Sequence, residues 1–172
     1  MSLDAPSNLT RPICLVGLMG CGKTSVGELL AKHLNVPFYD SDVEIERVTG
    51  KTIPEIFKEQ GEPAFRQMER ETIFRLLDQS TGVLSIGGGA FIQDEVRRLL
   101  LERADCVYLK TTPETLFNRV KGFTHRPLLQ NEDPLGTLKK LLNDREPFYL
   151  QASQVIETEG KSLEEVAEEI RS

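Results

Sequence analysis

The sequence lacks the cysteine pattern of a disulfide-bonded or zinc-binding protein. Its three cysteines, Cys14, Cys21 and Cys106, stand far apart, and none has a histidine or another cysteine at metal-ligand spacing. Neither a disulfide framework nor a metal cluster is expected. A reduced, cytoplasmic protein is the consistent interpretation, in which Cys14 and Cys106 fill an apolar core.

Long apolar runs, repeats and excess positive charge are also missing. No run approaches the roughly 18 apolar residues of a membrane span, and the N-terminus has no apolar signal segment. A formal net charge of −6 argues against nucleic acid as a partner, because binding a polyanion requires lysines and arginines in excess. The 172 residues, 39% hydrophobic and 28% charged, instead predict one globular domain with a sizeable core.

Short apolar runs alternate with amphipathic stretches along the chain. Residues 1–11 are polar and predict a disordered lead-in, and residues 12–172 predict a single domain. The predicted strands are residues 12–17, 36–40, 83–86, 106–109 and 154–158. The predicted helices are residues 22–34, 43–50, 53–61, 63–79, 94–102, 113–120, 135–149 and 162–170. Since each strand is apolar throughout, we expect an α/β doubly wound fold, with helices on both faces of a parallel sheet. Ligands in such folds bind beyond the carboxyl ends of the strands.

A glycine-rich loop connects the first predicted strand to the first predicted helix. Its residues 17–24, GLMGCGKT, match the pattern G-x-x-x-x-G-K-[ST] in full. In such a loop the backbone N–H groups and the helix N-terminus bind phosphate, Lys23 reaches the β- and γ-phosphates, and Thr24 offers a hydroxyl to Mg²⁺. The loop therefore predicts a nucleotide site. Cys21, at the helix N-terminus beside Lys23, is a candidate for reaction with thiol reagents.

Two acids follow the second predicted strand, in Tyr39-Asp40-Ser41-Asp42. Either acid can simply cap the next helix. At this strand end, however, one carboxylate can hold Mg²⁺ through water while the other accepts a proton from an attacking hydroxyl.

Arg66 lies near the start of a predicted helix, in Phe65-Arg66-Gln67-Met68-Glu69. Its spacing from Glu62 and Glu69 is that of ordinary surface ion pairs. Alternatively, Arg66 faces the ligand and Glu69 holds its guanidinium. The pattern alone leaves both interpretations open.

Three consecutive glycines, Gly87, Gly88 and Gly89, follow the third predicted strand. Glycine costs folding entropy, so a triplet indicates a backbone that something must approach closely. We expect these residues to form a floor under the phosphoryl acceptor, with backbone N–H groups available as donors.

The segment 121–134 shows no regular period and contains Arg126. Fourteen residues without regular structure predict a functional lid or a disordered segment. A lid arginine can supply charge to the transferring phosphoryl group, or it is a solvent-facing loop charge; the same alternatives hold for Arg145. Carboxylates suited to hydroxyls, together with arginines suited to an anion, favour a small hydroxylated carboxylic acid as the acceptor.

Taken together, these motifs resemble the shikimate kinase family. The carrying segments are GLMGCGKTSVGELLA, FYDSDVEIERVTGKTIPEIF, GEPAFRQMERE, IGGGAF, RPLL and DREPFY, in family order over residues 12–160. The resemblance implies a five-stranded parallel sheet in the order 2-3-1-4-5, a substrate-binding region at about residues 42–70 and a lid at about residues 120–134. It also implies transfer of a phosphoryl group from ATP to the 3-hydroxyl of shikimate, with Mg²⁺, in a cytoplasmic monomer of the aromatic amino-acid pathway.

The resemblance also assigns roles to individual residues. Those implied in ATP binding are Gly17, Leu18, Met19, Gly20, Cys21, Gly22, Lys23, Thr24, Ser25, Arg119 and Arg126. Those implied in shikimate binding are Asp42, Phe57, Phe65, Arg66, Gly87, Gly88, Gly89 and Arg145, with Glu69 orienting Arg66. Lys23, Asp42 and Arg126 are the implied catalytic residues, while Thr24 binds Mg²⁺ directly and Asp40 through water. A departure is Ser85-Ile86 before the triplet, where the family commonly has threonine.

Two other functions remain possible at this stage. A gluconate-type sugar-acid kinase also combines a phosphate loop with a carboxylate-bearing polyol, but gives no reason for the arginine helix and the glycine triplet. A nucleotide-binding protein that signals by closure would not need Asp42 or Arg126. Turnover of ATP with a small acceptor separates these possibilities.

Overall fold

A single parallel sheet organises the molecule. The structure is a computed structural model, and it describes residues 9–79, 81–120 and 132–171. The strands are β1 (Ile13–Val16), β2 (Phe38–Asp40), β3 (Val83–Ser85), β4 (Asp105–Lys110) and β5 (Gln154–Glu157). They pair in the order β2-β3-β1-β4-β5, and every pairing is parallel. The predicted fold class and the implied strand order are confirmed.

Eight helices surround this sheet in the part of the chain that the structure describes. They are α1 (Lys23–Leu34), α2 (Ser41–Thr49), α3 (Ile53–Gln60), α4 (Glu62–Gln79), α5 (Asp94–Arg103), α6 (Pro113–Val120), α7 (Pro134–Tyr149) and α8 (Leu163–Arg171). Gly50 and Gly61 end α2 and α3, as the sequence predicts. The predicted capping box opens α8, where Glu165 N–H donates to Ser162 Oγ at 3.1 Å. No helix among the described residues is long and apolar enough to cross a membrane.

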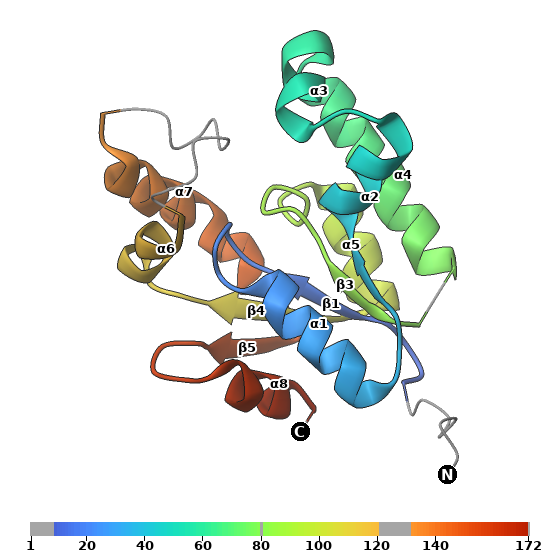
Figure 1. Cartoon of the computed structure of the whole chain (residues 1–172), viewed down its shortest axis with the longest axis vertical. Coiled ribbons are helices and arrows are strands. Elements are labelled where there is room, and N and C mark those ends of the chain that lie inside the picture. The colour runs from blue at the N-terminus through green and yellow to red at the C-terminus, as the bar shows by residue number, and fades with distance from the viewer. Residues whose placement is uncertain (1–8, 80, 121–131, 172) are drawn as a thin grey trace.

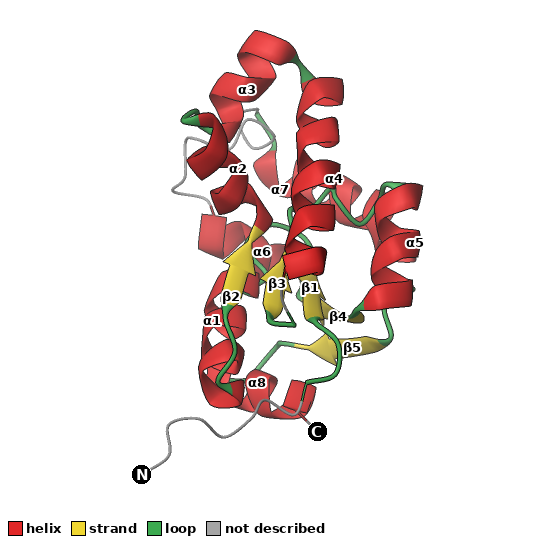
Figure 2. Ribbon diagram, turned by 90° about the vertical axis from the view of Figure 1, so that its right-hand side faces the viewer, coloured by secondary structure: helices red, strands yellow, loops and turns green. Residues whose placement is uncertain are grey.

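The central strands are buried on both faces, which explains their continuous apolar runs. In β1, Ile13 and Leu15 belong to one core cluster, which also contains residues of α1 and α8. Cys14 and Val16 belong to a second cluster with residues of α4 and α5. Figures 1 and 2 show α1 and α8 on one face of the sheet and α5 on the other. Alternate side chains of one strand thus pack against the helices on opposite faces of the sheet.

The cysteine prediction is confirmed for the core. Cys14 pairs in register with Cys106 on the neighbouring strand, and both thiols are free and fully buried. A hydrogen bond with Cys106, together with burial, raises the pKa of the Cys14 thiol. The two cysteines act as small apolar side chains at the centre of the sheet.

Helices α2 and α3 and the first half of α4 form a separate unit beyond the carboxyl ends of β2 and β3, while the second half of α4 packs on the sheet (Figure 2). They enclose a small core of their own around Ile45, Ile56 and Phe65. This unit covers the region expected to bind the acceptor, and it places its inner face above the glycine triplet.

Residues just before the predicted domain boundary at residue 12 contact the domain. Leu9 packs against the first core cluster, and Arg11 donates to the carbonyls of Glu102 and Ala104 at 2.8 and 3.0 Å. The remainder of the predicted lead-in, residues 1–8, lies outside the described residues.

Candidate active site

The loop between β1 and α1 is wound tightly around a buried cysteine. Gly17, Gly20 and Gly22 all have positive φ angles. A Cβ on Gly17 would lie 2.8 Å from Cys21 Sγ and 3.1 Å from the carbonyl oxygen of Leu109, so only glycine fits there. Because Cys21 is only 2% exposed, the expectation that it reacts with thiol reagents is not supported.

At the N-terminus of α1, no acidic side chain in the first turn compensates the positive end of the helix dipole. This helix has no acidic residue in its first turn and no side-chain cap, whereas α2, α3, α4, α5, α6 and α8 all begin with acids. Lys23, the first residue of α1, donates from Nζ to the carbonyls of Gly17 at 2.6 Å and Leu18 at 3.3 Å. A helix dipole and an ammonium group therefore converge on one loop, which is the arrangement that binds phosphate.

A cavity of about 580 Å³ opens over this loop. Arg119 lies at its edge and donates to the carbonyl of Gly20 at 2.9 Å. The predicted nucleotide residues that line the cavity are Met19, Gly20, Cys21, Gly22, Lys23, Thr24, Ser25 and Arg119. Gly17 and Leu18 belong to the loop but do not line this cavity, while Arg126 and residues 121–131 of the expected lid fall outside the described residues.

Asp40 caps α2, which is one of the two roles that the sequence left open, and it also faces the phosphate loop. Its Oδ1 caps α2 by accepting from the N–H groups of Asp42 at 2.9 Å and Val43 at 3.2 Å. Its Oδ2 accepts from Thr24 Oγ1 at 3.3 Å. A hydroxyl and a carboxylate facing the phosphate loop are hard oxygen donors, which suit Mg²⁺.

A second cavity, of about 570 Å³, adjoins the first. The two share Met19, Asp42, Gly87 and Gly88. The second cavity is lined by all of the residues expected to bind the acceptor: Asp42, Phe57, Phe65, Arg66, Gly87, Gly88, Gly89 and Arg145, with Glu69. The structure thus brings together on one cavity five segments that are far apart in sequence.

Asp42 lies at the junction of the two cavities. Burial raises the pKa of its carboxyl to about 7, and the negative charges of Glu69 and Asp40 add to this effect, while Lys23 and Arg66 oppose it. A carboxyl that titrates near neutrality is suited to accept a proton from a hydroxyl.

Charged side chains lie directly against each glycine of the triplet. A Cβ on Gly87 would stand 2.8 Å from Glu69 Oε2 and 3.1 Å from Asp42 Oδ1. On Gly88 it would stand 3.0 Å from Arg145 Nη1, and on Gly89 2.4 Å from Arg66 Nη2. The contacts at Gly87 with Glu69 and at Gly89 with Arg66 are closer than real Cβ atoms approach, and the other two are tight, so the triplet makes room for the charged groups of the site as well as forming the cavity floor.

Arg66 is directed into the site by a buried carboxylate. Its Nη1 donates to Glu69 Oε1 at 2.8 Å, and Glu69 is 1% exposed. The surface pair also forms, with Arg66 Nε 3.4 Å from Glu62 Oε1. The two interpretations of this arginine are therefore compatible, because one guanidinium serves both carboxylates and still lines the cavity.

Two buried carboxylate oxygens face Gly87 without a hydrogen-bond partner among the described residues. They are Asp42 Oδ1 and Glu69 Oε2. An unpaired buried acceptor is costly, and functional sites are where such atoms are found. Their position in the cavity wall suits a ligand that brings hydroxyl donors.

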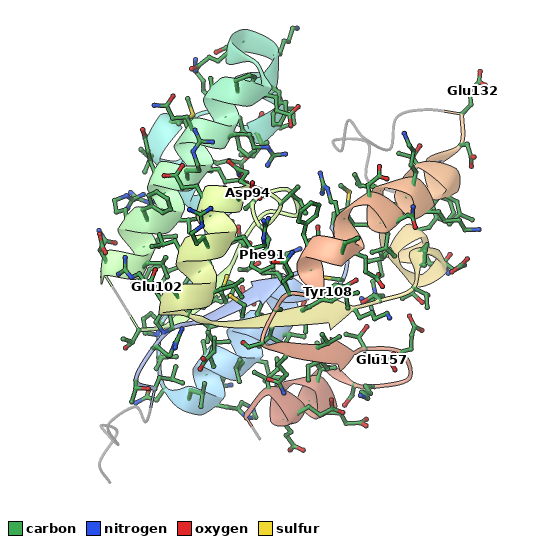
Figure 3. The ribbon with its side chains drawn as sticks, turned by 180° about the vertical axis from the view of Figure 1, so that it is seen from behind. Phe91, Asp94, Glu102, Tyr108, Glu132 and Glu157 are labelled. Carbon is green, nitrogen blue, oxygen red and sulfur yellow. The ribbon has the colours of Figure 1, made fainter. Side chains whose placement is uncertain are left out.

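The sequence did not identify the residues that hold the glycine triplet. Gly87 N–H donates to buried Ser41 Oγ at 3.3 Å, so this N–H is not free for a ligand as expected. Tyr149 OH donates to the carbonyl of Gly88 at 2.5 Å. Its ring packs against Tyr108, which Figure 3 labels on β4 beside the last turn of α7. Ser41 lies between Asp40 and Asp42, which the sequence pattern assigns to the site, and this position could have indicated that Ser41 also belongs to it.

A phosphate loop after β1, this strand order and a second cavity that meets the first define a P-loop kinase acting on a small molecule. A family model described as shikimate kinase matches residues 19–172, and the chain belongs to that family. It is 45% identical over 165 residues to the shikimate kinase of Cereibacter sphaeroides, an alignment covering 96% of this chain and 83% of the relative.

Solved structures agree with this assignment. A shikimate kinase from Acinetobacter baumannii in complex with shikimate is similar with a TM-score of 0.91 at 44% identity, over 96% of this chain and 95% of that one. A gluconokinase from Sinorhizobium meliloti 1021 has a TM-score of 0.60 at 19% identity, over 94% of this chain and 89% of that one. The second likeness shows the fold alone.

Proposed function

We propose that this chain transfers the γ-phosphoryl group of ATP to the 3-hydroxyl of shikimate, giving shikimate 3-phosphate and ADP. The observation that carries the proposal is the junction of a phosphate-binding cavity with a second cavity at Asp42. Family membership supplies the identity of the acceptor and its place in aromatic amino-acid synthesis. The cavity chemistry agrees, since arginines suit a carboxylate and buried carboxylate oxygens suit hydroxyls.

On the donor side, the loop binds the phosphates through its N–H groups and through Lys23. Thr24 and Asp40 are the residues that would hold Mg²⁺, which supplies charge neutralisation between the β- and γ-phosphates when bound. Arg119 lies at the cavity edge, where the adenosine part of ATP is expected. Arg126 is proposed to approach the phosphates from the lid.

On the acceptor side, Arg66 and Arg145 bind the carboxylate, and Phe57 and Phe65 pack on the ring. Asp42 accepts a hydrogen bond from the 3-hydroxyl and thereby aims its oxygen at the phosphorus atom. As the bond from the 3-hydroxyl oxygen to the γ-phosphorus forms and the bond from that phosphorus to the leaving oxygen of ADP breaks, the hydroxyl proton passes to Asp42, whose pKa of about 7 suits that transfer. We further propose that the chain acts as a cytoplasmic monomer.

Steady-state ADP release tests the proposal. Mg-ATP is supplied with shikimate, and in parallel with gluconate or a nucleoside monophosphate as the acceptor. We expect stimulation by shikimate alone, and omission of Mg²⁺ should abolish it. Stimulation by gluconate instead would overturn shikimate as the acceptor but leave Arg66 and Arg145 a carboxylate to bind, whereas stimulation by a nucleoside monophosphate would overturn the roles of both arginines. ATP binding without turnover on any acceptor would favour a nucleotide-binding signalling protein.

A further inference from the structure

Gln93 links Glu69, which lines the acceptor cavity, to Arg70, which does not line it. Its Nε2 donates to Glu69 Oε1 at 2.9 Å, and its Oε1 accepts from Arg70 Nη1 at 2.8 Å. The amide orientation is fixed by these partners, because a flipped amide would present its NH₂ to a guanidinium and its oxygen to a carboxylate. Gln93 does not line the cavity, and neither the family motifs nor the proposed mechanism uses it.

The backbone position of Gln93 indicates that its side chain serves this contact. Gln93 is the N-cap residue of α5, and Figure 3 labels its neighbour Asp94 at the start of that helix. N-cap positions favour serine, threonine, aspartate and asparagine, whose side chains bond the first N–H groups of the helix. Gln93 makes no such bond. Its side chain instead reaches across to α4.

This contact determines which oxygen of Glu69 faces the cavity. Glu69 Oε1 accepts from both Arg66 and Gln93, while Oε2 stays unpaired beside Gly87 and Asp42. An arginine and a carboxylate usually prefer a bidentate pair that uses both oxygens. With Gln93 holding Oε1, the pair remains monodentate, and Oε2 is kept in the cavity wall.

We propose that Gln93 is a positioning residue for the acceptor: it holds Glu69 so that Arg66 points to the acceptor carboxylate and Oε2 faces the acceptor hydroxyls. Without Gln93, Glu69 turns toward Arg66, and both groups leave their places in the cavity wall. The inference rests on the proposed function, since shikimate is the acceptor whose binding reports it.

Gln93→Ser separates positioning from stability. A serine hydroxyl at the N-cap can bond the N–H groups of Glu95 or Val96, so the thermal unfolding midpoint should equal or exceed that of the unchanged protein. The acceptor KM should nevertheless rise about tenfold, the effect of losing one hydrogen bond to a charged group, while the KM for ATP stays within about twofold. A purely structural role would instead lower the midpoint.

Gln93→Glu tests whether the N–H donor or the shape matters. It keeps the length of the side chain but places a carboxylate against Glu69, so the acceptor KM should rise more than in Gln93→Ser. Gln67→Ser is the matched control. Gln67 donates to Glu71 Oε1 at 3.1 Å on the exposed face of α4, in a similar amide–carboxylate pair whose two residues do not line the cavity. Its KM values should not change.

An acceptor KM in Gln93→Ser equal to that of the Gln67→Ser control would overturn the inference, and so would equal rises in the KM values for acceptor and ATP. A failure of the proposed function is distinguishable, because the unchanged protein would then not phosphorylate shikimate at all.

Discussion

The phosphate end of the donor cavity is built mainly from one continuous stretch of backbone, whereas the acceptor cavity is built from side chains of several segments. Residues 19–26 supply the loop and helix end on the donor side. The charged groups of the acceptor side, Asp42, Arg66, Glu69 and Arg145, come from three helices. Fixed backbone dipoles bind the phosphate groups, which every nucleotide carries. A network of buried charges instead recognises one acceptor, and each member depends on its neighbours.

The largest expected effect is that of Asp42→Asn, at the junction of the two cavities. The amide keeps the shape but cannot take up the hydroxyl proton, so kcat should fall by about 10² or more. ATP binding, measured by calorimetry, should stay within about threefold. Turnover near that of the unchanged protein would remove Asp42 from the mechanism and show that the acceptor side works by binding alone.

Gly89→Ala should affect the acceptor side only. The new Cβ would meet the guanidinium of Arg66, a flexible side-chain end that can move while the backbone stays in place. The acceptor KM should rise about tenfold through the displaced arginine, with the KM for ATP little changed. Gly50→Ala is the control: its Cβ meets nothing within 4 Å, but its φ of 70° is strained for alanine. It should lose stability and keep both KM values; equal KM effects in the two variants would refute the steric explanation.

The pH dependence of the free energy of unfolding reports how much the buried carboxylate of Asp42 destabilises the fold. The pKa of Asp42 rises from its ordinary 3.8 to about 7 in the fold, so between these values the folded protein holds a proton that the unfolded chain has lost. The contribution of Asp42 to stability therefore falls as pH rises through this window. Asp42→Asn should unfold at a higher temperature than the unchanged protein at pH 8, and the difference should shrink at pH 5. A difference independent of pH would contradict the raised pKa.

Tyr149→Phe should have the smallest effect. It removes the hydroxyl that donates to the Gly88 carbonyl and leaves this oxygen without that partner. Chemical denaturation should show a loss of about 1 kcal/mol in the free energy of unfolding, and the acceptor KM should change by no more than about threefold. A much larger change in KM would mean that Tyr149 also holds Arg145 in place.

Without the family resemblance, the sequence pattern predicts the donor side better than the acceptor side, and the reason is physical. A phosphate loop is a local structure, so eight consecutive residues are enough to identify it. The acceptor contacts are long-range: Gln93 and Glu69 are 24 residues apart, and Tyr149 and Gly88 are 61. Asp40 was ambiguous because a helix cap and a metal site use the same carboxylate; the structure shows the cap and a hydrogen bond from Thr24 to the other oxygen. The alternation of apolar strands with amphipathic helices predicted the layers, since the central strands β1, β3 and β4 are buried on both faces.

The close approach of charged side chains to the glycine triplet has a consequence for how this protein can change over generations. Each glycine is matched to a particular charged partner: Gly87 to Asp42 and Glu69, Gly88 to Arg145, and Gly89 to Arg66. A larger residue at any of the three displaces its partner, while loss of the partner removes the reason to keep the glycine. Glycines and charges should therefore be inherited as one unit, and a descendant that adopts a different acceptor has to exchange a glycine and its partner together.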